Sequence, residues 1–350
     1  MIEVLLYELP SFELLDAATV WDAVAWLNRN SGKARVLAGG TDLLSLMKDR
    51  VEGPELKIPE VLLNIKTIPE LNEITYDEHT GLRIGAAVTL NRLQSSDIIK
   101  EKFAVLSQAA GHVGTTQIRN MGTVGGNICQ RPRCMYFRHP HFVCYKKGGE
   151  KCYAVAGEHR YYHSIMKNGR CVMAHPSDIA AALAALEAEV VIAGSEGGKK
   201  MTLQDFFAPA NDFTETALKP GEFLAGVQLQ NPKGKTYQLF LKRRVRKASD
   251  FSLANVATVA RIIDGVCEDI RIVLGGITAF PYMASAAVEI LKGRKLTEAL
   301  ISRAAAASLA EAHPLLRNRY KVDLTTALVR RALASLWHEA ANAQVSNDCS

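Results

Sequence analysis

The chain is organised around one stretch, which begins with Gly111-His112-Val113-Gly114, continues through Gly122-Thr123-Val124-Gly125-Gly126-Asn127 and ends at Pro176-Ser177-Asp178. Five of the seven cysteines of the chain lie within it, namely Cys129, Cys134, Cys144, Cys152 and Cys171. Glycine-rich segments let backbone N–H groups approach a ligand closely, and cysteines supply soft thiolate ligands for a metal centre. The stretch therefore indicates two cofactor sites that share one segment of chain.

The length and composition indicate a globular protein of two or three domains. The chain has 350 residues, of which 48% are hydrophobic and 22% are charged. Residues Met1–Glu8 have no basic region and no cleavage site after them, so we expect a first strand there and no signal peptide. The most apolar stretch, residues 179–192, is too short to span a membrane. We expect a cytoplasmic protein without a membrane span, and leave open its export with a signal-bearing partner.

The clustered cysteines coincide with the positive charge of the chain. An odd number of cysteines, clustered in a large chain, is typical of metal binding in a reducing compartment and not of a disulfide framework. Between Arg131 and Cys171 there are nine Lys or Arg residues and two Glu, a net charge of +7, against +6 for the whole chain. Tyr and Phe residues are interleaved with these cations, so a nucleic-acid-binding module is an alternative, although such modules usually carry a basic stripe on a recognisable fold.

A strand, a glycine turn and a helix are expected near the N-terminus. Residues 15–29 have the apolar spacing of a helix, and residues 34–38 form a short strand that leads through Gly39-Gly40 into a second helix with Thr41 as its N-cap. This geometry directs backbone N–H groups towards a pyrophosphate. The third glycine of the Rossmann fingerprint is missing, so the turn alone is also consistent with a purely structural role.

Later segments alternate strands with helices up to about residue 232 and then change their order. We expect strands at 61–65, 82–90, 189–194 and 223–229, and helices near 93 and at 103–110, 179–186 and 203–207. After the linker at 232–235 we expect strands at 237–242, 252–262 and 270–277, then helices at 283–291, 296–312 and 324–341, and a loose tail at 347–350. Strands followed by helices predict a C-terminal α+β domain with a small antiparallel sheet.

Motifs in a fixed order closely resemble the flavin subunit of the molybdenum hydroxylases, the family of xanthine dehydrogenase, aldehyde oxidoreductase and carbon monoxide dehydrogenase. They are Val36–Leu43 (VLAGGTDL), Gln117–Asn127 (QIRNMGTVGGN) and Pro176–Asp178. Residues 240–242, 250–252 and 273–277 look like the C-terminal domain of the same family. The resemblance spans almost the whole chain.

This resemblance implies an α+β protein with a FAD-binding fold of the vanillyl-alcohol-oxidase type. FAD is expected between subdomains at 1–57 and 58–232, and a C-terminal α+β domain at 236–345. Residues 36–43 are expected to wrap the pyrophosphate. Asp178 is expected to form a hydrogen bond at the adenosine side of FAD. An alternative role for Asp178 is the N-cap of a helix that starts at Ile179. The implied FAD-binding residues are Val36, Leu37, Ala38, Gly39, Gly40, Thr41, Asp42, Leu43, Val113, Thr123, Val124, Gly125, Gly126, Asn127, Asp178, Leu224 and Lys242.

The segment at 128–175 departs from the common family pattern, in which the glycine loop reaches the Ser-Asp pair much sooner. It resembles the branch with an additional [4Fe-4S] cluster, which includes 4-hydroxybenzoyl-CoA reductase and bacterial aldehyde oxidoreductases, and Arg131–Phe137 and His175–Asp178 look more like the latter. The resemblance implies four iron ligands, Cys134, Cys144, Cys152 and Cys171.

Other interpretations of this segment stay open from the residues alone. Cys129 lies inside the glycine loop and is expected to be a packed free thiol. The cysteine spacings match no zinc-finger pattern, but His139, His141, His159 and His163 leave zinc as an alternative, as does a basic insertion with unligated thiols. The basic excess either offsets an anionic cluster or docks an acidic electron-transfer partner.

The resemblance implies an oxidoreductase subunit without a catalytic acid or base of its own. We expect a small [2Fe-2S] subunit and a large molybdopterin subunit as partners, in a heterotrimer or a dimer of heterotrimers. Electrons are expected to pass from the [2Fe-2S] centres to FAD and on to NAD, a quinone or ferredoxin. The alternatives are a reductase of the 4-hydroxybenzoyl-CoA type that runs in the opposite direction, and a zinc-containing RNA-binding module.

Overall fold

A small parallel sheet forms the N-terminal part of the computed structural model, which describes residues 8–167, 169–209, 211–247 and 249–348. The strand expected at Met1–Glu8 lies outside these ranges except for its last residue. The sheet has the order β1-β3-β2, and both outer strands run parallel to β3. The elements of this N-terminal part are β1 (Glu13–Asp16), α1 (Val20–Arg29), β2 (Ala34–Leu37), α2 (Leu43–Lys48) and β3 (Val61–Asn64).

Two features of this first sheet differ from the sequence-based expectation. The expected helix at 15–29 begins only at Val20, where Thr19 and Asp22 form a capping box, and the residues before it form β1. Pairing with β3 outweighs the local helical pattern there, since strand preference depends strongly on tertiary context. Strand β3 lies beyond residue 57, where the first subdomain was expected to end, yet it is the central strand of the first sheet.

The second sheet is antiparallel, with the order β4-β5-β8-β6-β7. Short strands β4 and β7 were not expected from the sequence, whereas the expected strands at 189–194 and 223–229 are present. The elements of this part are η1 (Pro69–Asn72), β4 (Ile74–Asp77), β5 (Gly81–Gly85), α3 (Leu90–Ser95), α4 (Asp97–Lys102), α5 (Ala104–Gly111), α6 (Thr116–Met121), α7 (Val124–Ile128), α9 (Asp178–Ala185), β6 (Glu189–Gly194), β7 (Gly197–Thr202), α10 (Leu203–Phe206) and β8 (Phe223–Leu229).

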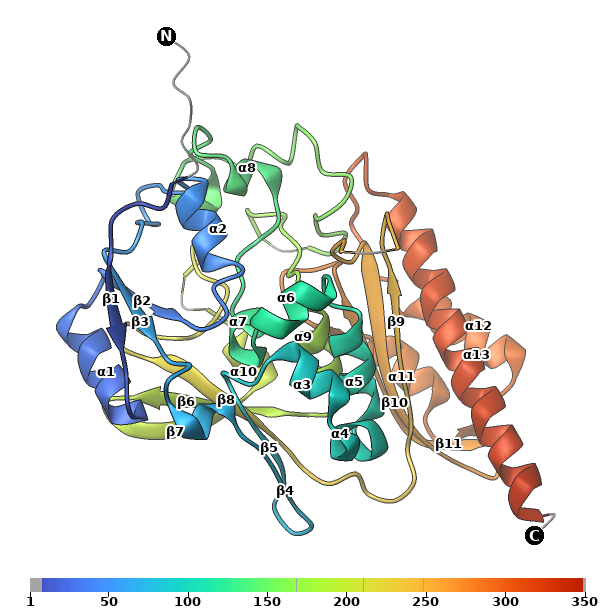
Figure 1. Cartoon of the computed structure of the whole chain (residues 1–350). Helices are drawn as coiled ribbons and strands as arrows, with labels where there is room; N and C mark the ends of the chain where they lie inside the picture. The colour runs from blue at the N-terminus through green and yellow to red at the C-terminus, as the bar shows by residue number, and fades with distance from the viewer. Residues whose placement is uncertain (1–7, 168, 210, 248, 349–350) are drawn as a thin grey trace.

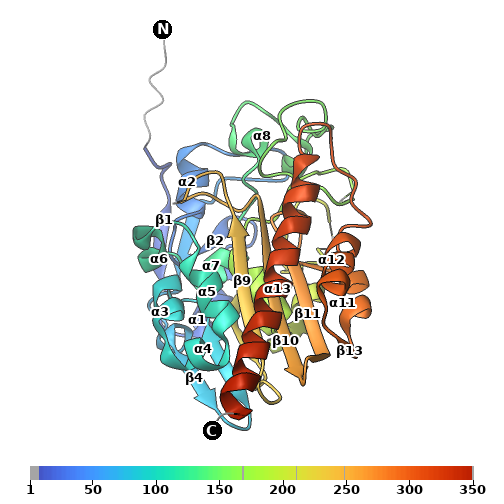
Figure 2. The same ribbon diagram turned by 90° about the vertical axis from the view of Figure 1, so that its right-hand side faces the viewer.

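The C-terminal sheet is antiparallel and lies between two layers of helices, as Figures 1 and 2 show. Its order is β12-β11-β10-β9, and β13 pairs with β11. The elements are β9 (Tyr237–Arg243), β10 (Ala254–Ile263), β11 (Val266–Gly275), β12 (Tyr282–Met283), α11 (Ser285–Leu291), β13 (Arg294–Lys295), α12 (Glu298–Ala307) and α13 (Tyr320–Asp348). The strands and helices expected here are therefore present, and α13 extends through residues 347–348 of the expected loose tail.

Strand β10 separates two hydrophobic cores. Val256 and Ala260 pack in the core formed with α11, α12 and α13, whereas Ala257 and Val259 pack in the core formed with α5 and α9 of the second part. This alternation follows from the two-residue period of a strand. The C-terminal sheet is consequently apolar on both faces.

The cysteine segment, which we define as residues 129–175, crosses the top of the molecule in Figure 1 with little regular structure. Among the residues of the segment that the structure describes, the helices are α8 (Met135–Arg138) and η2 (Tyr145–Lys147). Phe137, Cys134 and Cys144 of the segment pack with Leu46 and Val51 of the N-terminal part. Ile165 and Met166 of the segment pack in the C-terminal core. The segment is thus held by two different parts of the fold. No helix among the described residues is long and apolar enough to cross a membrane.

Candidate cofactor sites

A cavity of about 960 Å³ lies where the N-terminal part, the second part and the C-terminal sheet meet. Of the expected FAD-binding residues, all but Val124 line it, although they come from positions between 36 and 242 in the chain. Val124 is buried in the hydrophobic core beneath the second glycine loop. The lining also includes Arg131, Arg133 and Phe251, which were not among the expected FAD-binding residues. We call this space the large cavity.

The first glycine turn owes its composition to close packing. A Cβ atom on Gly39 would lie 2.2 Å from the carbonyl oxygen of Met121, so only glycine fits where the turn meets the second loop. Gly40 has φ +71°, a left-handed conformation that favours glycine. The expected N-cap role of Thr41 is wrong, because Asp42 occupies the cap position of α2 and makes no capping hydrogen bond.

The second glycine loop is fixed by two side-chain hydrogen bonds. Thr123 Oγ1 accepts a hydrogen bond from the Gly126 N–H at 3.2 Å and so caps the short helix α7. Asn127 Oδ1 accepts a hydrogen bond of 2.6 Å from Ser177 Oγ, which ties this loop to the start of α9. The loop therefore presents its backbone to the large cavity from a rigid position.

Asp178 is the centre of a buried polar network at the edge of the large cavity. Its carboxylate lies 2.6 Å from Lys242 Nζ and accepts hydrogen bonds from Ser252 Oγ at 2.5 Å and Asn255 Nδ2 at 2.8 Å. The side chains of Asp178 and Lys242 are only 3% and 1% exposed. The helix cap proposed as an alternative role for Asp178 is wrong, because Ser177 is the N-cap of α9. The network instead joins α9 to strands β9 and β10.

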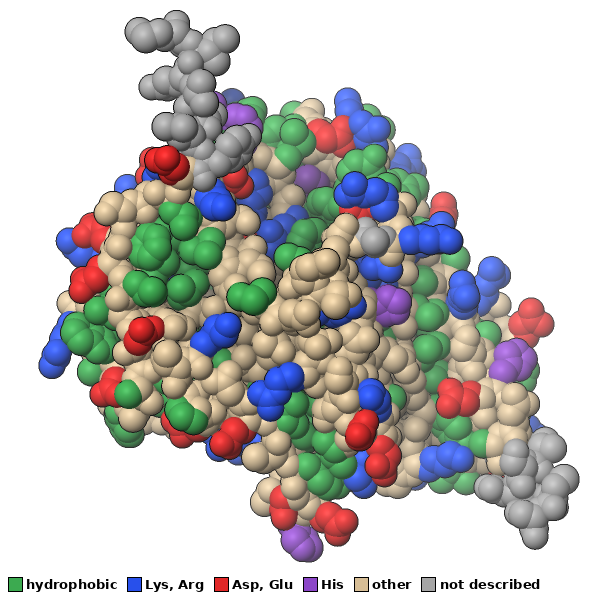
Figure 3. Space-filling view, in the orientation of Figure 1, with side chains coloured by type: hydrophobic (Ala, Val, Ile, Leu, Met, Phe, Trp, Pro, Cys, Tyr) green, Lys and Arg blue, Asp and Glu red, His purple; other side chains and the backbone are tan. Residues whose placement is uncertain are grey.

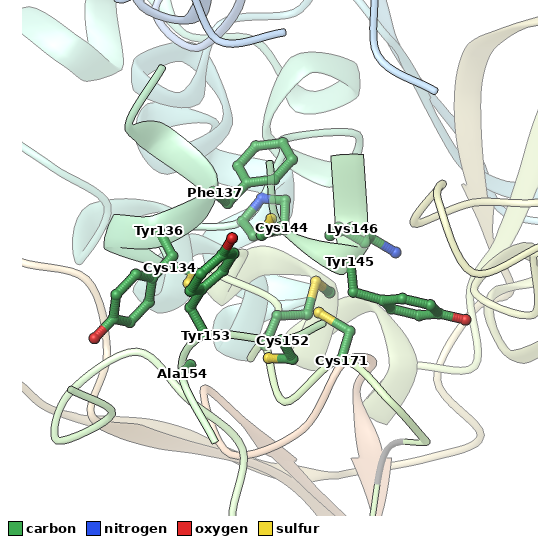
Figure 4. A pocket seen from close by; sticks show the side chains of 12 residues that line it. Cys134, Tyr136, Phe137, Cys144, Tyr145, Lys146, Cys152, Tyr153, Ala154 and Cys171 are labelled. Atoms are coloured by element: carbon green, nitrogen blue, oxygen red, sulfur yellow. The ribbon is translucent and has the colours of Figure 1, made fainter. Parts of the chain in front are cut away.

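The four expected iron ligands line a second, smaller cavity within the cysteine segment (Figure 4). The space between them is about 10 Å³, room for about one water molecule, and its walls include Tyr136, Phe137 and Tyr153. Cys171 and Cys152 are joined by a hydrogen bond between their side chains. We call this space the thiol cavity. Cys129 does not line it but packs against the main core and the large cavity, as expected for a packed free thiol.

Backbone amides point at the sulfur atoms of the thiol cavity. The N–H groups of Tyr136 and Phe137 approach the sulfur of Cys134, and those of Lys146 and Lys147 approach the sulfur of Cys144. Such donors stabilise a thiolate, although burial raises the pKa of the Cys134 thiol to about 11 when no metal is bound. The hydrogen bond from Cys171 lowers the pKa of Cys152 below its ordinary value. The donor set is therefore suited to holding thiolates in a dry site.

Histidines do not join the thiols around a single ion. His159 Nδ1 lies 2.8 Å from the Ala154 carbonyl oxygen, and its Nε2 accepts a hydrogen bond from the Arg317 N–H at 2.9 Å. The rings of His139 and His141 contact each other at a tilt of 55°, with their centroids 5.3 Å apart. Over the whole described part of the chain, no three His, Cys, Asp or Glu side chains are placed to hold one metal ion.

The cations of the cysteine segment are largely used inside the protein. Arg131 and Lys146 both pair with Glu215, and Arg133 and Arg138 both pair with Asp42. Lys147, which is fully buried, donates a hydrogen bond of 2.9 Å to the His139 carbonyl oxygen. The exposed cations of the segment are Lys151, Arg160, Lys167 and Arg170. Lys and Arg side chains are frequent over the upper part of the face in Figure 3, but acidic side chains are interspersed with them.

Asp42 connects the first glycine turn to the cysteine segment. Its carboxylate lies 2.7 Å from Arg133 and 2.5 Å from Arg138, and it accepts a hydrogen bond from the Arg131 N–H at 2.8 Å. Burial alone would raise the pKa of Asp42, but these three donors hold it below the ordinary value. The ion pairs between distant segments leave no local pattern in a sequence. The sequence shows only that an acidic residue, Asp42, lies in the glycine motif and that Arg131, Arg133 and Arg138 lie close together elsewhere in the chain. It does not show that these residues pair.

Comparison with known proteins identifies both parts of the chain. Residues 10–232 match the model of the FAD binding domain in molybdopterin dehydrogenase, and residues 240–336 match that of the CO dehydrogenase flavoprotein C-terminal domain. The chain is 34% identical over 315 residues to the aldehyde oxidoreductase FAD-binding subunit PaoB of Escherichia coli K12, an alignment that covers 88% of this chain and 91% of PaoB.

Carbon monoxide dehydrogenases show the same similarity in sequence and in structure. The medium chain of the Afipia carboxidovorans enzyme is 27% identical, with 96% of this chain and 99% of that chain covered. A solved carbon monoxide dehydrogenase from Hydrogenophaga pseudoflava superposes with a TM-score of 0.75 at 28% identity, over 95% of this chain and 99% of that chain. The chain therefore belongs to the family of FAD-binding medium subunits of the molybdenum hydroxylases.

Proposed function

We propose that the large cavity binds FAD through the residues expected from the sequence. The observation that carries this proposal is that all of them except Val124 line one cavity, although they come from three parts of the fold. Residues 36–43 and 123–127 supply backbone for the pyrophosphate, and the close packing of Gly39 leaves no room for side chains there. Asp178 and Lys242 would bond the nucleotide from within their buried network, and Val113 and Leu224 would contact it through apolar surface.

This chain serves as the electron-transfer subunit of a larger enzyme under this proposal. The substrate, an aldehyde or an aromatic N-heterocycle, would be oxidised at a molybdopterin cofactor in a large partner subunit. A small [2Fe-2S] subunit would complete the complex, which we place in the cytoplasm. When bound, FAD would accept electrons one at a time from iron–sulfur centres and release them to NAD, a quinone or ferredoxin. The residues of this chain bind and orient the flavin and exclude water from it.

We place a [4Fe-4S] cluster on Cys134, Cys144, Cys152 and Cys171. Their convergence on one apolar cavity supports this assignment, and so do the backbone amides directed at their sulfur atoms. Four thiolate ligands are the number that such a cluster requires. The internal use of Arg131, Arg133 and Lys146 weighs against a nucleic-acid-binding surface.

The domain division follows as part of the same proposal. Units at 1–57, 58–232 and 236–345 correspond to the two halves of the FAD site and the C-terminal domain. The position of β3 supports moving the first boundary beyond Asn64. The cysteine segment is an insertion in the second unit.

Cofactor analysis of the purified chain tests the proposal. We expect about one FAD and about four irons per chain, with a broad thiolate-to-iron absorption band that dithionite bleaches under anaerobic conditions. Cys152→Ser should abolish the iron and retain the flavin, whereas the matched variant Cys267→Ser should retain both, because Cys267 lies in the C-terminal core and lines neither cavity. Flavin without iron would overturn the cluster assignment, and zinc without flavin would overturn the entire proposal.

A further inference from the structure

Residues 131–134 form a wall between the large cavity and the thiol cavity. Arg131 and Arg133 line the large cavity, whereas Pro132 and Cys134 line the thiol cavity. Successive side chains of an extended segment point to opposite sides, so this alternation is the one expected of a strand-like stretch. The cysteine segment therefore contributes directly to the wall of the proposed FAD site.

The cations in this wall and beside it outnumber the carboxylates that pair with them. Asp42 is shared between Arg133 and Arg138, and Glu215 is shared between Arg131 and Lys146. Each carboxylate thus carries one negative charge against two positive charges. Burial and the charge of Arg131 also lower the pKa of Arg35, a further cation that lines the large cavity. An anion in the large cavity would balance this excess.

Arg133 is the cation best placed to meet such an anion. Its guanidinium stacks over the Phe251 ring at 4.4 Å from the centroid and is held by Asp42 at 2.7 Å and by Gln130 Oε1 at 2.9 Å. Both of these bonds use one terminal nitrogen, and Nε is buried without a hydrogen-bond partner among the described residues. The side chain is 17% exposed, so its charge is largely removed from water. A planar guanidinium fixed in this way suits a phosphate oxygen.

We propose that Arg133, supplied by the cysteine segment, binds the pyrophosphate of the flavin nucleotide in the large cavity. The inference rests on the proposed function, since it requires that FAD occupies this cavity. It adds a side-chain contact from the insertion to the backbone contacts of the two glycine loops. Arg138 has a different role: it donates to the Pro132 and Arg131 carbonyl oxygens and so positions the wall.

Binding of two flavins by the full-length chain, stripped of flavin, tests the inference. FAD carries the pyrophosphate and riboflavin does not, so the two ligands separate this contact from contacts to the ring. We expect Arg133→Gln to weaken FAD binding about tenfold or more, the factor given by one hydrogen bond between charged groups. Riboflavin binding should stay unchanged. Fluorescence titration measures both affinities.

Arg170→Gln is the matched control, because Arg170 also directly precedes an expected iron ligand but is exposed and does not line the large cavity. It should leave both affinities unchanged. Arg133→Lys keeps the positive charge but loses the planar, two-pronged guanidinium, so it should weaken FAD binding several-fold. This variant replaces Arg133→Gln if the glutamine variant does not fold. Equal weakening of FAD and riboflavin, or wild-type FAD affinity in both Arg133 variants, would overturn the inference. Failure of the wild-type chain to bind FAD would overturn the proposed function itself.

Discussion

Asp178 illustrates how a single buried ion pair supports this fold. Among the described residues, its carboxylate is the only acidic group that pairs with Lys242. Both side chains are nearly inaccessible to water. Removal of one partner from a buried pair leaves an uncompensated charge, which costs about 3–5 kcal/mol. We therefore expect Asp178→Asn to lower the free energy of unfolding by about that amount. Urea denaturation followed by circular dichroism measures it.

The control for this variant is Asp97→Asn. Asp97 pairs with Lys100 at 3.1 Å on the surface, and its side chain is 98% exposed. Exposed pairs contribute little because water screens them, so the change in stability should stay below about 1 kcal/mol. Equal losses in the two variants would contradict the role given to the buried network.

Buried histidines make the stability of the protein depend on pH. Burial is the main reason that the pKa values of His163 and His175 fall from 6.5 to about 4. The unfolded chain takes up protons below pH 6.5 whereas the folded chain does not, so stability is lost as the pH falls from 6.5 towards 4. His163→Leu should remove a loss of about 3 kcal/mol over this range. Unfolding measured at pH 7.5 and pH 4.5 checks this, and an unchanged difference between the two would contradict it.

At the scale of secondary-structure elements, the short helix α7 depends on its cap. Thr123→Ala removes the hydrogen bond to the Gly126 N–H and should cost about 1 kcal/mol of stability. Because the loop that follows lines the large cavity, FAD affinity should fall as well. Thr297→Ala removes the equivalent cap of α12, where Thr297 Oγ1 accepts from the Leu300 N–H at 3.2 Å, away from the cavity.

Calorimetry and flavin titration compare these two variants. The stability losses should be similar, since both threonines make one capping bond. Only Thr123→Ala should release flavin, because α12 contributes nothing to the cavity lining. Flavin loss in both variants would show that global stability, and not the loop, controls binding.

The elements that sequence analysis predicted correctly are those with strong local signals. Residues 179–186 carry an alanine-rich helical pattern, and α9 is present there with seven of its side chains buried. Strand β1 has the sequence Glu-Leu-Leu-Asp and only becomes a strand by pairing with β3. The glycine motifs located the large cavity because close backbone packing requires glycine. The position of Arg133 in the lining of the large cavity was not predicted, because its partner Asp42 lies in a distant segment.

At the scale of the whole molecule, the C-terminal sheet packs directly against the FAD-binding domain. Strand β10 packs Ala257 and Val259 against the helices of the second part, and Lys242 reaches Asp178 across the same boundary. A chain truncated after residue 235 would expose this apolar surface of α5 and α9. We expect that fragment to aggregate, because a large exposed apolar face is an aggregation liability, and size-exclusion chromatography of the fragment and of the full chain checks this. A monomeric, flavin-binding fragment would contradict this view.

The wall at residues 131–134 also limits how the cysteine segment can vary in length. Insertion or deletion of one residue there would turn the side chains that follow it within the wall to the opposite side, as a register slip does in a strand. An arginine would then face the thiols, and a cysteine would face the flavin site. Elsewhere in the segment, Gly169 lies in a loop with open space beside it, since a Cβ atom there would meet nothing within 4 Å. Related chains should therefore differ in length at such loops, and keep the four-residue wall intact or change it in steps of two.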